Sequence, residues 1–399
     1  MVTVQEHYDA YPYPERDPKD EARRLISGSP SHPMEIDHWV FGGQRNWTQP
    51  FRALVAGGGT GDGLIQLAQI LASAKVPYEI TYRDLSTSAR NIAEARAAAR
   101  NLNGIDFVTG SLLDAADLGQ FDYIDCCGVL HHLPDPAEGF AALRSALAPG
   151  GGLGFMVYAP YGRSGVYPLQ EAFGRLFEGL PPKERLVRAK DLVAALPEGH
   201  PFSANRNLGD HKASDAGFYD LLLHGQDRAF SVTELAEVLG ATGWRLMGFV
   251  TPSLYDLSRI TLRPTGMDDI EAMAVAEKLR GSIRVHVAYA IPSEDVARKP
   301  ARGPAPALVP HLRGAQAQPL ARQVAQGKAI ALSLKELKTS VILPKDTAPL
   351  IAAINGQRTL GQISQLAGLD PIRFGALWGK VERELIDWGL MLYSGLGHR

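Results

Sequence analysis

The sequence predicts an α/β fold in which helices cover both faces of a parallel sheet, with a small helical module appended at the C-terminus. Between residues 51 and 292, short apolar segments alternate with segments of helical periodicity, the pattern of strand and helix units in a parallel sheet. A glycine-rich turn follows the first apolar segment, where a chain must turn sharply. A stretch rich in Pro, Ala and Arg at 293–312 is typical of a linker to residues 313–399.

The elements of the main domain are expected in alternating order. Residues 1–50, rich in Tyr, Pro, His and Trp, should wrap the surface as a partly ordered arm, because their prolines exclude a long helix. The expected strands are 52–56, 78–83, 105–108, 123–127, 153–158, 244–250 and 283–291. The expected helices are 64–71, 88–100, 136–147, one opened by the cap Ser231 and Glu234, and 267–279.

The connection after the fifth strand is far longer than usual. It contains helical patterns of its own at 169–177, 184–196 and 213–223. Insertions of this length commonly act as lids or substrate walls. We therefore predict a helical lid insertion over residues 160–230.

The C-terminal region 313–399 has the element order of a winged helix. A short strand is expected at 341–343, helices at 347–354, 360–367 and 371–388, and a strand that could pair back at 390–393. On the last helix, basic and acidic residues are interleaved: Arg373, Lys380 and Arg383 with Glu382, Glu384 and Asp387. The helix therefore lacks the continuous basic face of a DNA-binding helix. A nucleic-acid partner is not expected; packing on the core, dimerisation and grip on a polypeptide substrate remain open.

Composition places the protein among ordinary globular proteins. The chain has 399 residues, with 45% apolar and 21% charged residues and a net charge of −2. Its two cysteines, Cys126 and Cys127, are adjacent, so a bridge between them would be strained, and a reducing compartment is expected. No uninterrupted apolar stretch reaches eighteen residues, and the N-terminus lacks the apolar core of a signal peptide. We expect a soluble cytoplasmic protein without a membrane partner.

The glycine-rich turn has the sequence Gly57-Gly58-Gly59-Thr60-Gly61-Asp62-Gly63. Glycines between a strand and a helix let a ligand approach the backbone closely. The nicotinamide pattern G-x-G-x-x-G fails here, because Asp62 or Leu64 stands where its third glycine would be. The pattern G-x-G-x-G fits instead.

Three further pieces follow at the ends of the next strands. Asp84 ends the second strand, about twenty residues past the loop, where a carboxylate can accept both ribose hydroxyls of an adenosine. Residues 110–114, Gly-Ser-Leu-Leu-Asp, follow the third strand, where an adenine edge would arrive. Residues 128–136, Gly-Val-Leu-His-His-Leu-Pro-Asp-Pro, leave the carboxyl end of the fourth strand, which is the cleft side of such sheets.

In order and spacing, these four pieces resemble the class I S-adenosylmethionine-dependent methyltransferases over roughly residues 50–291. The resemblance implies a Rossmann-like seven-stranded sheet with an antiparallel seventh strand. Segments 38–43 and 222–228 look like a bacterial branch of this superfamily, and the layout with a C-terminal module is similar to bacterial protein-lysine methyltransferases. The implied domains are an arm over the cofactor site (1–50), a methyltransferase domain (51–292), a linker (293–312) and a winged-helix-like domain (313–399).

The resemblance also assigns a cofactor, S-adenosylmethionine, and residues that contact it. The loop would hold the methionine part, Asp84 the ribose, and Ser111 with Leu112 the adenine. Many members of the family have Asp in place of Ser111, so adenine contact could rest on the main chain or on Asp114. The full cofactor set is Tyr8, Tyr13, Gly57, Gly58, Gly59, Gly61, Asp84, Leu85, Ser111, Leu112, Gly128 and Val129.

Methyl transfer from a sulfonium needs an acceptor held in line and a base where the acceptor must lose a proton. His131 and His132 are the candidate bases, although such a pair can also only shape the pocket. Tyr8, Tyr11 and Tyr13 of the arm either fold over the cofactor or pack as ordinary aromatic anchors. The separation of the remaining histidines, His38, His200, His211 and His224, shows no metal-ligand spacing, so no metal is predicted.

Two acceptor classes remain open, a small metabolite and a protein side chain. A small metabolite predicts a closed pocket lined by lid aromatics such as Tyr161, Tyr167 and Phe218. A protein side chain predicts an open groove that runs towards the tail. The alternative outside catalysis is a regulator that senses S-adenosylmethionine and acts through the winged-helix-like module.

Overall fold

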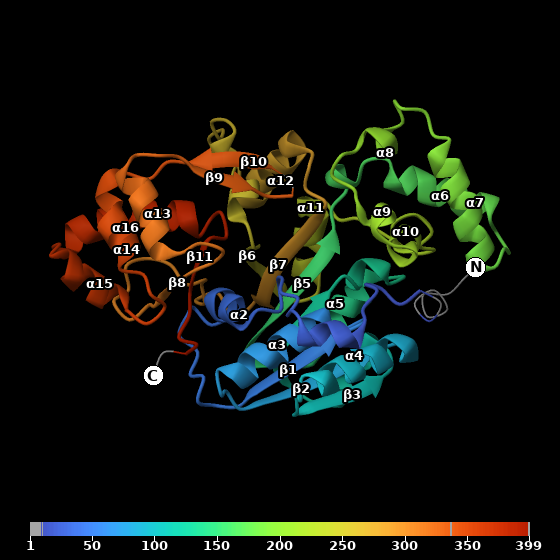
Figure 1. The fold of residues 1–399 in the computed structure, drawn as a ribbon, viewed down its shortest axis with the longest axis horizontal. Coiled ribbons are helices and arrows are strands. Elements are labelled where there is room, and N and C mark those ends of the chain that lie inside the picture. Colours follow the sequence, from blue (N-terminus) through green and yellow to red (C-terminus); the bar gives the residue numbers. More distant parts are fainter. Residues whose placement is uncertain (1–8, 10, 336, 398–399) are drawn as a thin grey trace.

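A seven-stranded sheet forms the centre of the protein, with a helical lid on one side and the C-terminal module on the other (Figure 1). This computed structural model describes residues 9, 11–335 and 337–397. The sheet order is β3-β2-β1-β4-β5-β7-β6. Its strands are β1 (Phe51–Ala56), β2 (Tyr78–Asp84), β3 (Ile105–Thr109), β4 (Phe121–Cys127), β5 (Leu147–Tyr158), β6 (Trp244–Phe249) and β7 (Val285–Pro292).

The predicted alternation of strands and helices is confirmed. Neighbouring strands from β1 to β5 pair in parallel, and β7 pairs antiparallel with both β5 and β6, as the resemblance implied. From β1 the chain runs outward through β2 to β3. It then returns across the sheet, so that β4 lies on the other side of β1. Ligands of open α/β sheets bind at such a switch point, beyond the carboxyl ends of the strands.

The side chains of β1 show how the sheet buries both faces. Phe51, Ala53 and Val55 point into one apolar cluster, whereas Leu54 and Ala56 point into the other, because successive residues of a strand face opposite sides. The first face is covered by α2 (Pro33–Val40), α3 (Asp62–Ser73) and α4 (Thr87–Ala99). The second is covered by α5 (Pro136–Ser145), α11 (Val232–Ala241) and α12 (Asp269–Arg280).

Helix α2 corrects the expectation that residues 1–50 wrap the surface. It is buried along nearly its whole length and packs between the sheet and the C-terminal strand (Figure 1). The carboxylate of Asp37 accepts hydrogen bonds from the backbone of Arg45 (3.0 Å) and from Trp47 Nε1 (3.0 Å). It also accepts from Ser394 Oγ (2.7 Å) and the backbone of Gly395 (2.9 Å). A charged helix can be buried here because the end of the chain supplies its partners.

We expect Asp37→Ala to lower the free energy of unfolding by about 3–5 kcal/mol, because four donors would lose their acceptor, two of them in fully buried hydrogen bonds. Urea unfolding followed by circular dichroism measures this. Asp346→Ala is the control, since Asp346 is exposed in the C-terminal module and should change stability by less than about 0.5 kcal/mol. A loss below about 1 kcal/mol for Asp37→Ala would show that water replaces the lost acceptor.

The predicted lid is present as a helical insertion with its own apolar core. Phe173, Phe202, Phe218 and Leu222 pack together in it. Its helices are α6 (Val166–Leu176), α7 (Pro182–Ala194), α8 (Pro201–Ala204), α9 (Asp210–Ala213) and α10 (Asp215–Leu222). A separate core lets the lid hold a defined shape beside the carboxyl ends of the strands.

The C-terminal module is only partly as predicted. The strand expected at 390–393 exists as β11 (Met391–Tyr393) and pairs antiparallel with β8 (Pro310–Leu312), which lies in the predicted linker. The linker is therefore packed rather than free, because Ala301, Leu308 and Val309 are buried. The other elements are α13 (Ala317–Ala325), the antiparallel pair β9 (Ile330–Ser333) and β10 (Lys338–Val341), α14 (Ala348–Ala352), α15 (Leu360–Ala367) and α16 (Pro371–Leu385). Likeness to a winged helix stays a prediction.

Candidate active site

A cavity of about 300 Å³ lies at the carboxyl ends of β1, β2 and β4. It is lined by loop glycines, by the ends of the strands and by one side of the lid. Of the predicted cofactor set, the lining includes Tyr13, Gly57, Gly58, Gly59, Asp84, Leu85, Ser111, Leu112, Gly128 and Val129. Gly61 is not part of the lining, and Tyr8 lies outside the described residues.

The loop after β1 has room only for glycine at its first position. Gly57 has φ +69°, and a Cβ atom there would stand 2.4 Å from Cγ2 of Val129. Gly61 acts differently, as the left-handed residue (φ +96°) that opens α3. Gly57, Gly58 and Gly59 line the cavity, so a ligand held there would lie against loop backbone that carries no side chains.

Asp84 lies at the end of β2 and faces the same space. Its two oxygens accept from the backbone N–H groups of Gly59 and Ser86, each at 2.8 Å. Burial raises the pKa of this carboxyl, and these two hydrogen bonds act in the opposite direction. Each oxygen retains a lone pair for a further donor, which is the requirement for holding a pair of hydroxyls.

Asp114 lies apart from the predicted adenine position. It forms an ion pair with Arg83 at 3.1 Å and is not part of the cavity lining. The hydroxyl of Ser111 accepts from the backbone of Leu113 (3.1 Å) and so caps the short helix that follows. Gly110, Ser111 and Leu112 line the cavity there, and adenine contact at this place stays a prediction.

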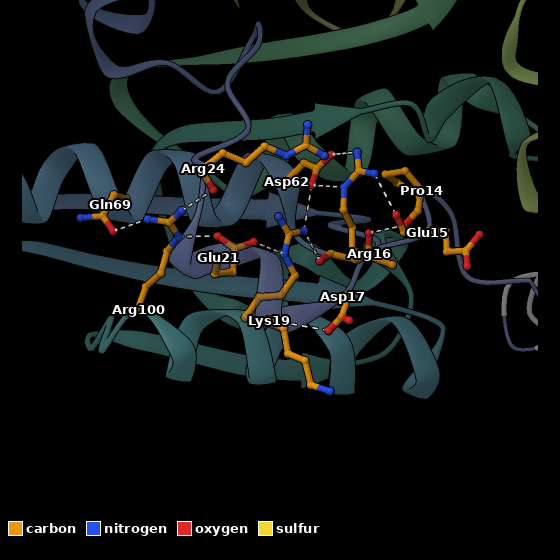
Figure 2. A network of polar contacts seen from close by, with 12 residues as sticks. Pro14, Glu15, Arg16, Asp17, Lys19, Glu21, Arg24, Asp62, Gln69 and Arg100 are labelled. Atoms are coloured by element: carbon orange, nitrogen blue, oxygen red, sulfur yellow. Dashed lines mark hydrogen bonds and ion pairs between the residues drawn. The ribbon is translucent and has the colours of Figure 1, made fainter. Parts of the chain in front are cut away.

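The N-terminal segment is held against the cavity by a network of ion pairs (Figure 2). Arg16 binds Asp62 at the start of α3 through two hydrogen bonds of 2.8 and 2.6 Å. Glu21 binds Arg96 of α4 at 2.6 Å and also pairs with Arg100. Thr60 donates to the carbonyl of Pro14 (2.7 Å), which keeps Tyr13 and Pro14 at the cavity wall.

The two candidate bases occupy different positions. His132 lines the cavity, whereas His131 is fully buried behind it, with its ring 3.9 Å from the ring of Tyr158. Neither ring nitrogen of His131 has a hydrogen-bond partner, and burial holds its pKa well below the usual range. Of the pair, only His132 can meet an acceptor in the cavity.

His132 belongs to a cluster that the lid completes. Its ring stacks on that of His224, with centroids 3.8 Å apart. Nitrogen and oxygen atoms of His132, Asp220 and His224 lie within 4.8 Å of one another. Asp220 also lines the cavity and accepts from the hydroxyl of Tyr158 (3.1 Å). The cluster joins residues about ninety positions apart, which sequence spacing could not reveal.

The backbone of Gln226 contacts both His132 and His224, and these contacts fix opposite tautomers for the two rings. Its carbonyl, which can only accept, lies 3.0 Å from His132 Nδ1, so that nitrogen carries the proton and Nε2 keeps a lone pair. The backbone N–H of Gln226 donates to His224 Nδ1 (3.1 Å), so neutral His224 carries its proton on Nε2. The close spacing of His132, Asp220 and His224 could suit a metal ion. However, the Nδ1 lone pair of His224 already accepts the hydrogen bond from Gln226. The absence of a metal stays a prediction.

Asp125 is a site residue that the sequence analysis missed. It lies on β4 opposite Val55 of β1, is 1% exposed, and lines the cavity. Its Oδ2 has no hydrogen-bond partner. Burial raises the pKa of this carboxyl to about 7, and a hydrogen bond from Ser31 acts weakly against that shift. The available signal was the single acidic residue inside the apolar strand predicted at 123–127.

The two adjacent cysteines of β4 differ in exposure. Cys126 is buried, whereas Cys127 is exposed and lines the cavity. Both are free thiols.

We expect Asp125→Asn to stabilise the protein without ligand, more at pH 8 than at pH 5. Because the folded pKa (about 7) exceeds the ordinary value of 3.8, the native protein loses stability as the pH rises from about 4 to about 7, and no more above that. Asparagine removes this loss, so its advantage should grow by about 2–3 kcal/mol between pH 5 and pH 8. Thermal melts at both pH values check this, and an advantage independent of pH would contradict it.

Comparisons with known proteins agree with the fold. Residues 54–153 match the family model described as a methyltransferase domain. An uncharacterised protein of Synechococcus sp. is 34% identical over 253 residues, 61% of this chain and 58% of that protein. A ubiquinone biosynthesis O-methyltransferase of Psychrobacter arcticus is 33% identical over 96 residues, 23% of this chain and 36% of that protein. The chain spans less than two thirds of the length of either relative.

Solved structures extend the likeness to nearly the whole chain. PKMT2 from Rickettsia typhi superimposes with a TM-score of 0.62 at 13% identity, covering 93% of this chain and 77% of that one. Its complex with AdoHcy gives a TM-score of 0.62 at 14% identity, with coverage of 91% and 75%. This protein therefore shares the fold of PKMT2 around its seven-stranded sheet, and residues 54–153 within that fold match a methyltransferase domain.

The described helices are all too short or too polar to cross a lipid bilayer.

Proposed function

We propose that this protein is an S-adenosylmethionine-dependent methyltransferase. The observation that carries the proposal is the convergence of the glycine loop, Asp84 and Asp125 on one cavity at the switch point of the sheet. The match to a methyltransferase domain and the AdoHcy bound to PKMT2 support it. When bound, S-adenosylmethionine supplies a methyl group on a sulfonium, a good leaving group.

The residues around the cavity fit this cofactor. Asp84 can accept both ribose hydroxyls, and the backbone at Leu112 borders the adenine. Asp125 suits the ammonium of the methionine part, because its Oδ2 is buried without a hydrogen-bond partner and a nearby cation stabilises a buried carboxylate. Gly57, Gly58 and Gly59 line the cavity, and backbone without side chains lets the amino-acid portion approach closely.

His132 is the residue best placed to take a proton from the acceptor. Its Nδ1–H is fixed by the Gln226 carbonyl, so Nε2 is the basic nitrogen. When Nε2 is protonated, the nearby carboxylate of Asp220 can stabilise the imidazolium. His224 is less suited to this role, because protonating its Nδ1 would break its hydrogen bond with Gln226.

The acceptor and the cellular location remain part of the proposal. Of the lid aromatics predicted to line an acceptor pocket, Tyr167 lines a second cavity within the lid, while Phe218 packs in the lid core. The pair of free cysteines supports a reducing, cytoplasmic compartment.

The experiment has two arms. Isothermal titration with S-adenosylmethionine should give one site per chain, and the product S-adenosylhomocysteine should compete for it. Incubation with the methyl-labelled cofactor and a cell extract should then transfer label to a small-molecule or protein fraction. If S-adenosylmethionine does not bind, the proposal is refuted. If it binds but no label is transferred in cell extracts from several growth conditions, the alternative of a regulator that senses S-adenosylmethionine is favoured.

A further inference from the structure

The lid forms a second, open cavity of about 1000 Å³ between α6, α7 and residues 224–227. Its lining comprises Tyr167, Gln170, Glu171, Gly174, Arg175, Glu178–Pro182, Arg185, His224, Gly225 and Asp227. His224 belongs to this wall and stacks on His132, which lines the first cavity. The two cavities therefore meet at the histidine pair.

Arg185 is the unusual residue of this lid cavity. It is 7% exposed, and its Nε has no hydrogen-bond partner. Within the described part of the chain, no carboxylate or carbonyl pairs with its guanidinium; the structure gives it only the ring of Tyr219, 5.9 Å away. An unpaired buried charge is costly, and native proteins rarely keep one without a use.

Other buried arginines of this chain show the contrast. Arg163 pairs with Asp227 at 3.0 Å, and Arg96 pairs with Glu21 at 2.6 Å and with Asp62 at 2.8 Å. Each has a carboxylate within hydrogen-bond distance. Arg185 alone of these three lacks one and lies instead at a cavity wall.

The other charges of the lid cavity do not neutralise Arg185. Asp227 is already committed to Arg163 and to the amide of Gln170 (2.9 Å). Glu171 and Glu178 are exposed, so water screens them. Helix α7 also begins at this wall, and its cap residue Pro181 provides no side-chain hydrogen bond. The partial positive charge of the helix start adds to that of Arg185.

We propose that the lid cavity binds the oxyanion of an acidic small molecule, with the Arg185 guanidinium as its principal donor, and that this molecule is the methyl acceptor. The planar fork of arginine matches a carboxylate or phosphate through two parallel hydrogen bonds. The assignment of the ligand as the acceptor rests on the proposed function. It favours a small acid over a lysine side chain, which would bring a second cation to the lid cavity.

The test compares the wild type with Arg185→Met, which keeps an unbranched apolar side chain and removes the guanidinium and its charge. Arg188→Met is the control, because Arg188 lies on the same helix, is exposed, and pairs only with Glu184. Inorganic phosphate and succinate are titrated into each protein, which separates phosphate from carboxylate recognition. The titration of S-adenosylmethionine is repeated on all three.

We expect one of the two anions to bind the wild type and Arg188→Met equally, and Arg185→Met at least tenfold more weakly. Without anion, Arg185→Met should melt no lower than the wild type, because no native partner is lost. The proposal is overturned if neither anion binds the wild type, if Arg185→Met binds as well as the wild type, or if Arg185→Met melts several degrees lower.

The assignment as acceptor is tested with the labelled cofactor. Label transferred by the wild type should appear in small molecules retained on an anion-exchange resin, and Arg185→Met should transfer at least tenfold less. Label found only in protein overturns the assignment. If S-adenosylmethionine does not bind at all, the proposed function fails, whereas the anion titrations still decide on the lid cavity.

Discussion

Replacing Asp84 with alanine is expected to weaken the binding of S-adenosylmethionine by a factor of about 100–10 000, because two hydrogen bonds to a charged acceptor are lost, each worth about 1.5–3 kcal/mol. The carboxylate also accepts from Gly59 in the glycine loop, so the substitution loosens the loop as well. Isothermal titration measures the loss.

Asp106→Ala is the matched control for this measurement. Asp106 is a carboxylate on the neighbouring strand β3, but it is exposed and not part of the cavity lining. Its substitution should leave the affinity unchanged. An Asp84→Ala protein that binds within threefold of the wild type would show that the ribose is held elsewhere.

Replacing His132 with glutamine should reduce the rate of methyl transfer by a factor of about 100–10 000, the usual contribution of a general base. Glutamine keeps a donor and an acceptor but cannot take a proton. The affinity for S-adenosylmethionine should change much less, which separates loss of proton transfer from loss of the site. Single-turnover rates with saturating cofactor measure the effect.

His131→Phe serves as the comparison, because its ring is buried against Tyr158 with both nitrogens unpartnered. A phenyl ring fits an apolar position, so the rate should stay close to that of the wild type. Equal losses from both substitutions would mean that the pair shapes the pocket and that neither residue is the base.

The sequence was informative wherever the signal was local. Alternating strands and helices, the glycine pattern at Gly57 and the carboxylate at Asp84 each follow from spacing within about thirty residues, and the structure brings them to one cavity. These features depend on backbone geometry, which short patterns describe well.

The features that were missed depend on distant partners. Asp220 and His224 reach His132 only because the lid folds back over β4. Arg185 lies in the helix predicted at 184–196, and only the three-dimensional arrangement shows that no carboxylate among the described residues pairs with it. The burial of helix α2 could not be predicted, because two of the groups that donate to Asp37 lie more than 350 residues away in the sequence.

The hydrogen bond from Ser394 to Asp37 spans 357 residues of sequence. During synthesis, helix α2 therefore lacks two of the four donors to Asp37 until residues 394 and 395 have been made. A shortened chain that ends before Ser394 would leave this helix without its closing partners. Loss of activity after removal of the C-terminal module would consequently report incomplete folding, and cannot by itself assign that module a role in substrate recognition.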